Sequence, residues 1–202
     1  MSKSNFKSRR GLYLYTCFFL FTGIGFAVLF DYSLAQTNTE EFCTSCHEMQ
    51  INLEEYEDSA HDLNHSGVKA TCPDCHVPKA FWPKMYAKLY AAKDVYHHFA
   101  GTIDTEEKYE AYRLKMAKAV WKRMKETDSR ECRSCHDTDS MDFSEQPGRA
   151  ARKHKNLAQS GKTCIDCHKG IAHSLPEDYD ESEEEDDEER ETVSDNEEAQ
   201  SE

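Results

Sequence analysis

The N-terminal part of the chain contains a long run of apolar positions. Gly11 to Phe30 (GLYLYTCFFLFTGIGFAVLF) holds no charged residue, and Lys3, Lys7, Arg9 and Arg10 precede it. Twenty residues in a helix span ~30 Å, the thickness of a bilayer hydrocarbon core. The pattern predicts a single transmembrane helix over 11–30, with residues 1–10 in the cytoplasm and the rest outside it. The alternative is a cleaved signal peptide, because Ser33-Leu34-Ala35 resembles a small-x-small cleavage site. Signal-peptide apolar regions, however, usually span about 7–15 residues, and this one is longer.

Two further segments show the three- and four-residue spacing of amphipathic helices. Pro83 can start the first of them, which runs to about Phe99 before Gly101. The second follows Asp104-Thr105-Glu106-Glu107, which reads as a capping box with Asp104 as the N-cap, and it occupies about 104–127. Because no alternating β-branched run occurs, the fold is predicted to be mainly α with extensive loops.

The C-terminal segment 177–202 is strongly acidic. It contains 16 Asp and Glu against one Arg, a local charge of −15, while the whole chain carries −14. The preceding residues therefore carry about +1, so the acidity belongs to the tail alone. Such a segment repels itself and offers little apolar surface, which predicts disorder. It could serve solubility only, dock a basic partner surface, or bind cations weakly; no nucleic-acid partner is expected.

Eight of the nine cysteines form four pairs, each within a C-x-x-C-H motif. The motifs are Cys43/Cys46 with His47, Cys72/Cys75 with His76, Cys132/Cys135 with His136, and Cys164/Cys167 with His168. The first cysteines are separated by 29, 60 and 32 residues, which indicates a duplicated two-motif unit. We therefore predict two dihaem-type halves, about 39–100 and 128–176, within an extracytoplasmic domain at 31–176.

This motif is typical of covalent haem attachment. Zinc sites and thioredoxin-like redox pairs also use C-x-x-C, but neither requires a histidine directly after the second cysteine. In a c-type cytochrome two thiols one helical turn apart bind the vinyl groups, and the adjacent imidazole binds the iron. Four such motifs predict four covalent c-type haems. Since about 36 residues serve each haem, the porphyrins themselves are expected to form the apolar centre.

Each iron also needs a sixth ligand or keeps an open position. His61 and His154 lie 11 and 10 residues before Cys72 and Cys164, and His173 ends the motif KGIAH. These three histidines are the predicted distal ligands, ahead of His65, His97 and His98. Two axial histidines fill the iron's coordination shell, which suits electron transfer.

The segments FCTSCHEM, SGVKATCPDCHVP, GTIDTEEK, DSRECRSCH, MDFSEQPGRAA and GKTCIDCHKGIAH resemble the NapC/NirT family of membrane-anchored tetrahaem quinol dehydrogenases. The resemblance covers roughly Thr39 to Pro176. It implies electron flow from membrane quinol (menaquinol or ubiquinol) through the haems to a periplasmic reductase of the nitrate, nitrite or N-/S-oxide type. It also implies an inner-membrane location with the haem domain in the periplasm. A lone anchor helix and a small head are compatible with a homo-oligomer.

The same resemblance indicates further site residues. Met49 matches a methionine that can ligate the first iron in relatives, and Lys88 and Asp94 match a quinol site on the following helix. A carboxylate there can accept a proton from quinol, ideally with a raised pKa. Relatives often carry histidine at the position of Lys79, so one sixth ligand is open, and His97 or His98 could replace it. An electron relay without a quinol site, reduced by another protein, is the alternative function.

Overall fold

The computed structural model describes residues 3–57, 59–180 and 182, and over these residues it contains helices and loops but no strand. The prediction of a mainly α fold is therefore confirmed. In chain order the elements are α1 (Lys3–Gln36), α2 (Glu40–Cys43), the 3-10 helix η1 (His47–Met49), α3 (Gln50–Glu57), α4 (Cys72–His76), α5 (Phe81–Phe99), α6 (Glu106–Glu126), α7 (Arg130–Arg133), the 3-10 helix η2 (Thr138–Ser140), α8 (Gly148–Lys155) and α9 (Leu157–Ser160). Most of the predicted acidic tail, including 183–202, lies outside the described residues.

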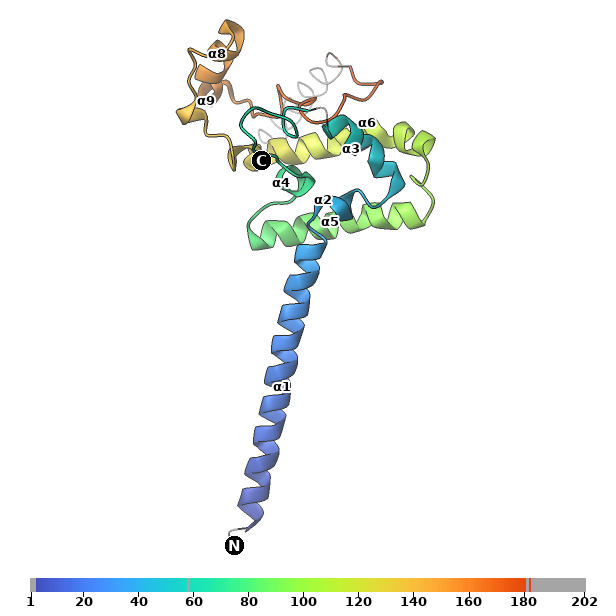
Figure 1. The fold of residues 1–202 in the computed structure, drawn as a ribbon, viewed down its shortest axis with the longest axis vertical. Helices are drawn as coiled ribbons and strands as arrows, with labels where there is room; N and C mark the ends of the chain where they lie inside the picture. Colours follow the sequence, from blue (N-terminus) through green and yellow to red (C-terminus); the bar gives the residue numbers. More distant parts are fainter. Residues whose placement is uncertain (1–2, 58, 181, 183–202) are drawn as a thin grey trace, which may run out of the picture.

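Helix α1 projects from the head formed by the other elements (Figure 1). Its segment Arg9–Gln36 is long and apolar enough to cross a membrane, and its large apolar side chains are exposed. The helix continues beyond the predicted end at Phe30 because nothing in 31–36 breaks it. Thr37 closes it, donating its amide N–H to the Ser33 carbonyl at 3.0 Å.

Helices α5 and α6 are the two long helices of the head, and both lie near their predicted positions. Helix α5 starts at Phe81, two residues before Pro83, and ends before Gly101, whose φ of +70° favours glycine. The predicted N-cap of α6 was wrong by one residue. Thr105 is the cap, with its side chain accepting the Lys108 N–H at 3.4 Å, whereas Asp104 pairs with the Lys108 ammonium at 2.7 Å.

The side-chain core of the head is small. Trp121 and Met124 of α6 pack against Ile165, with Tyr179 covering the indole at a ring-centroid distance of 5.1 Å. The other buried apolar residues among those described are Tyr56, Ala87, Ile103, Tyr109 and Ala151. So few residues cannot fill the interior of a head this long, in keeping with the expectation that bound porphyrins complete it.

Candidate haem-binding site

Three of the four C-x-x-C-H motifs, those at Cys72, Cys132 and Cys164, fold as single helical turns, whereas the first passes from the end of α2 through an extended Cys46 into η1. The amide of His136 donates to the Cys132 carbonyl at 2.9 Å, and the amide of His168 donates to the Cys164 carbonyl at 3.0 Å. Helix α4 makes the same turn from Cys72 to His76. Residues three and four apart share one side of a helix, so each turn presents two thiols and an imidazole together. Covalent haem attachment requires this arrangement.

The second and fourth motifs carry the same stabilising hydrogen bonds. Thr71 donates its amide and its hydroxyl to the Asp74 carboxylate at 2.8 and 2.7 Å. Thr163 makes the equivalent pair of bonds to Asp166 at 2.6 and 3.0 Å. Both aspartates have a lowered pKa, chiefly from these bonds at Asp74 and in spite of burial at Asp166. The carboxylates therefore cap both motif turns in the same way.

The first and third motifs share a different bond. The Ser45 hydroxyl donates to the Phe42 carbonyl at 2.8 Å, and the Ser134 hydroxyl donates to the Glu131 carbonyl at 2.7 Å. In each case the serine precedes the second cysteine and the acceptor precedes the first. This alternation supports the duplication predicted from the motif spacing, while a duplication of whole halves stays a prediction.

Two of the predicted attachment residues, Cys135 and Cys167, differ from the others in their exposure. Both are exposed to solvent, whereas the other six motif cysteines are half-buried. The Cys135 thiol lies 3.7 Å from the neighbouring Ser134 hydroxyl, and His136 and His168, which follow the two cysteines, are exposed as well. The polypeptide alone therefore leaves these two turns open to solvent. The physical reason is that each of these cysteines ends a short surface turn of a head with a small side-chain core, so the polypeptide does not cover it.

Every motif histidine faces one other histidine. The ring-centroid distances are 6.4 Å for His47–His98, 6.1 Å for His61–His136, 6.4 Å for His76–His173 and 6.1 Å for His154–His168. A metal–imidazole bond of ~2.0–2.1 Å, with about 1.1 Å from nitrogen to ring centre, gives two rings on one metal a separation of about 6.3 Å. The four pairs therefore have the spacing that two axial imidazoles on one iron require.

Three of these partners, His61, His154 and His173, are the predicted distal candidates. The fourth, His98, was ranked below them by sequence, and only the doubt raised by Lys79 pointed towards it. Two of the pairs join the halves of the chain, because His61 faces His136 and His173 faces His76. The head is therefore one interlocked unit rather than two separate modules.

Hydrogen bonds orient two of the partner rings. The His98 ring donates through Nδ1 to Glu48 at 2.6 Å, and the His154 ring donates through Nδ1 to Gln146 at 2.7 Å. In both cases Nε2 stays available towards the motif histidine, as in metal sites whose outer partners fix the ligand tautomer. Glu48 is 3% exposed and also lies 3.3 Å from His47 Nδ1. Sequence analysis missed Glu48 and Gln146, and no spacing rule identifies them.

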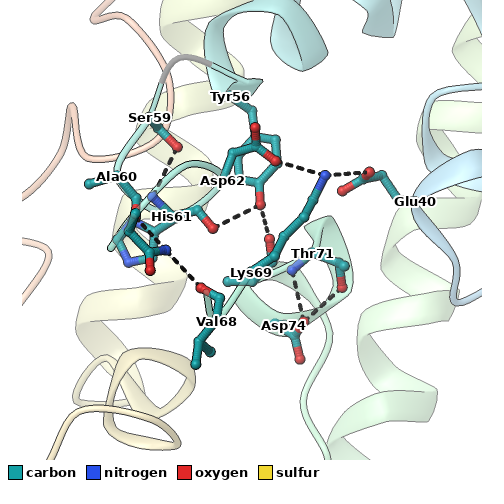
Figure 2. A network of polar contacts seen from close by, with 12 residues as sticks. Glu40, Tyr56, Ser59, Ala60, His61, Asp62, Val68, Lys69, Thr71 and Asp74 are labelled. Atoms are coloured by element: carbon teal, nitrogen blue, oxygen red, sulfur yellow. Dashed lines mark hydrogen bonds and ion pairs between the residues drawn. The ribbon is translucent and has the colours of Figure 1, made fainter. Parts of the chain in front are cut away.

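The loop that carries His61 is fixed by polar contacts between three segments (Figure 2). Lys69 pairs with Asp62 at 2.8 Å and with Glu40 of α2 at 3.2 Å. The Tyr56 hydroxyl of α3 donates to the carbonyls of His61 and Ala70. His61 Nδ1 is buried without a protein hydrogen-bond partner, so the loop holds an imidazole that the polypeptide alone does not satisfy.

The loop that carries His173 is tied to two helices. Arg113 of α6 pairs with Glu55 of α3 at 2.6 Å, and the Ser174 backbone contributes its amide to Glu55 at 3.1 Å and its carbonyl to Arg113 at 3.0 Å. Burial lowers the pKa of His76 to about 4, and its neighbour His173 adds to the shift. Burial also lowers the pKa of His173, so both rings are neutral near pH 7, the form that binds metals.

The four motifs follow one another in space in chain order. Helix α2 packs against α4, and α4 packs against α7. The pKa of Cys43 is lowered to about 7, chiefly by a hydrogen bond with the Cys72 thiol of the next motif. The fourth motif contacts the segment just before the third, because the Ile165 amide donates to the hydroxyl of the fully buried Ser129 at 3.1 Å. The row starts beside the end of α1, and α8 and α9 lie far from that helix (Figure 1).

The residue matched to a quinol site that contacts the end of α1 is Lys88. The Lys88 ammonium donates to the Thr37 carbonyl at 2.7 Å and to the Thr37 hydroxyl at 3.1 Å, and burial lowers its pKa. Asp94 is accessible at its surface, yet the surrounding protein desolvates it enough to raise its pKa. Lys88 and Asp94 share no hydrogen bond or ion pair within the described residues. Met49 contacts Asn52 through its sulfur at 3.9 Å, and Lys79 is exposed.

A membrane-spanning helix, a small helical head and four C-x-x-C-H motifs with facing histidines define a class, the membrane-anchored multihaem cytochromes c. A sequence model of the NapC/NirT cytochrome c family, N-terminal region, matches residues 6–178. The chain therefore belongs to the NapC/NirT cytochrome c family, whose members carry covalently bound haem.

Similar proteins cover most of the chain. A protein of Allochromatium vinosum, named provisionally as a tetraheme cytochrome-c type, is 56% identical over 79% of this chain and 87% of that protein. The cytochrome c-type protein NapC of Escherichia coli is 53% identical over 77% of this chain and 78% of its own length. The denitrification system component NirT of Stutzerimonas stutzeri is 51% identical over the same shares. No solved structure gives a significant match.

Proposed function

We propose that the chain is a tetrahaem cytochrome c that oxidises quinol in the membrane and passes electrons to a periplasmic reductase of the nitrate, nitrite or N-/S-oxide type. The observation that carries the proposal is the set of four histidine pairs, each with one motif member. The names NapC and NirT among the relatives support the link to such reductases. The basic residues at the start of α1, which precede its apolar run, support a periplasmic head.

In this proposal the eight motif cysteines hold the four haems covalently, and the eight paired histidines are the axial ligands. When bound, the haems supply the redox chemistry, with each iron exchanging one electron. His47 and His98 are the ligands proposed for the first haem, because Met49 turns its sulfur towards Asn52. His98 then supplies the sixth ligand left open by Lys79.

The quinol end lies at α5, beside the end of the membrane helix. Lys88 is fixed to Thr37 and lies close enough to Cys43 to influence the pKa of its thiol, so a quinol oxygen bound at Lys88 would lie next to the first motif. Asp94, whose raised pKa suits proton transfer, is the proposed acceptor for protons released on oxidation. Menaquinol and ubiquinol are both compatible with these groups.

The acceptor end lies at the fourth motif. Cys167 and His168 are exposed there, and the partner ring of His154 lies on α8. Helix α8 also carries exposed Arg149, Arg152 and Lys153. A basic surface beside an exposed haem edge would attract an acidic reductase surface and speed its association.

The test uses the purified full chain from cells that mature c-type cytochromes. Its mass should exceed that of the polypeptide by four haems, and a reduced quinol analogue should reduce the haems in the visible spectrum. A mass without added haem would contradict the whole proposal. Four haems that accept electrons from a small chemical donor but not from quinol would favour the alternative, an anchored relay reduced by another protein.

A further inference from the structure

The outward face of α5 carries large apolar side chains that no described residue covers. Trp82, Tyr86, Leu89 and Tyr96 are 78, 66, 76 and 68% exposed. At about 100° per residue these four positions fall within a sector of ~80°, roughly 140° away from the buried Ala87. Phe81 and Phe99 lie outside this sector, about 60° beyond Tyr96. We call Trp82, Tyr86, Leu89 and Tyr96 the outer stripe.

The outer stripe lies on the face of α5 turned away from the buried Ala87, and therefore away from the rest of the head. Helix α5 runs across the end of α1, and α2, α3, α4 and α6 lie on its other side (Figure 1). Lys88, near the middle of α5, fixes this crossing by donating to the carbonyl and hydroxyl of Thr37. Since Ala87 packs towards the head, the opposite face of α5 points towards the membrane that α1 is suited to cross.

The height of α5 places the outer stripe in the headgroup layer. Thr37 is seven positions after Phe30, which ends the uncharged run. This corresponds to a rise of ~10.5 Å along the helix. Helix side chains extend about 5–6 Å from the helix axis, so the stripe reaches within roughly 5 Å of the hydrocarbon. The headgroup region is about 5–7 Å thick on each side of a bilayer.

We infer that α5 is an interfacial helix whose outer stripe inserts into the surface of the same membrane that α1 crosses. Trp and Tyr are the side chains that favour this layer, because their rings combine an apolar body with a polar group. Exposed Lys93 lies within the same sector, with its ammonium 3.6 Å from the centre of the Tyr90 ring, and a lysine in this layer can pair with anionic lipid phosphates. The head is thus held to the membrane at two places, by α1 and by α5, and this second contact does not depend on quinol oxidation.

The test compares two introduced cysteines in the full haem-loaded chain. Cys17→Ala removes the free thiol, and the motif thiols are occupied by haem. Leu89→Cys places a thiol in the outer stripe. Leu63→Cys is the matched control, because Leu63 is 73% exposed. It belongs to the α3–α4 loop, which lies away from α1 (Figure 1). Lipid nanodiscs of phosphatidylcholine and phosphatidylglycerol, without quinone or reductase, carry one chain each. A membrane-impermeant maleimide is added and the adduct is measured by mass.

We expect Leu89→Cys to react at least tenfold more slowly than Leu63→Cys, because only the first is covered by lipid. Equal rates would overturn the inference. Protection that appears only in discs holding two chains would also overturn it, since a second copy would then cover the stripe. The visible haem spectrum verifies that both variants fold.

Discussion

His97 and His98 are neighbours on α5 with different surroundings. The His98 ring faces His47 at 6.4 Å, whereas the His97 ring contacts Tyr96 at 5.6 Å. We predict that His98→Met raises the midpoint potential of one haem and changes its ferric EPR signal, because Met/His ligation raises the potential of a c-type haem. His97→Met, the control, should leave all four haems unchanged. If Met49→Leu changes the signal and His98→Met does not, Met49 is the ligand.

Glu48 is the buried carboxylate beside the rings of His47 and His98. It accepts the Nδ1 proton of His98 at 2.6 Å, a bond that increases the basicity of this imidazole, the proposed ligand. Glu48→Gln keeps an acceptor but removes the charge, so the potential of the same haem should rise while the other three stay constant. A spectroscopic redox titration measures this. Glu54→Gln, an exposed change on α3, is the control, and an equal shift there would remove the positioning role of Glu48.

At the scale of one element, α5 combines the tether to α1 with the proposed quinol residues. Lys88→Met should slow haem reduction by a quinol analogue by about tenfold or more, because an oriented charge is lost near the reacting oxygen. Thr37→Val removes one of the two hydrogen bonds made by Lys88 and separates the tether from the quinol role. If Thr37→Val slows the reaction as much as Lys88→Met, Lys88 acts only through the fold.

Asp94, on the same helix, should determine how the rate of quinol-driven haem reduction depends on pH. Partial desolvation raises its pKa, while Lys93, His97 and Arg123 act in the opposite direction. A proton acceptor must be ionised, so quinol-driven reduction should fall as the pH drops through this raised pKa. Asp94→Asn should lower the rate at neutral pH by about 100-fold, the usual contribution of a positioned base, and remove the acid limb. Stopped-flow kinetics with a chemical donor as control measures both, and an unchanged pH profile would contradict the role.

At the scale of the whole molecule, the proposed quinol and acceptor ends are separate surfaces. Replacing Arg149, Arg152 and Lys153 by Glu should slow electron delivery to an acidic reductase and reduce its salt dependence, because steering is lost. Haem reduction by quinol should stay unchanged, which provides the internal control. Equal slowing of both reactions would indicate a folding defect. Removal of 177–202 shows separately whether the acidic tail contributes to docking.

Much of this arrangement could be predicted from local patterns. The spacing of C-x-x-C-H sets one helical turn, and the structure forms that turn at Cys72, Cys132 and Cys164. The apolar run gives α1, and the four-residue periodicity gives α5 and α6. The start of α6 was shifted by one residue because Asp104 binds the Lys108 side chain, and Thr105 takes over the cap. Choices between adjacent polar residues depend on such contacts.

The exposure of individual motif thiols could not be predicted from the motif. All four C-x-x-C-H segments have the same local spacing, yet Cys135 and Cys167 are exposed while Cys46 and Cys75, at the matching position, are half-buried. Exposure depends on which segments pack over a turn, and the spacing within the turn carries no information about them.

Pairing of the histidines could not be predicted in the same way. His61 and His154 occupy matching positions in the repeat, yet His154 faces the motif that follows it and His61 faces His136 of the other half. The networks around Lys69 and Arg113 decide this, since each joins segments far apart in the chain. The position of Glu48 between two rings likewise results from α5 folding back over the first motif.

The sequence by itself determined the anchor, the helical class and the four attachment motifs, because these follow from length, periodicity and fixed spacing along the chain. Only the tertiary structure decided which imidazoles face each other, which carboxylate orients them, and that α5 crosses the end of α1. The physical reason is that axial ligation and membrane contact need groups brought together from distant segments. That convergence comes from packing and from ion pairs between loops and helices, and neither is encoded in any single stretch of residues.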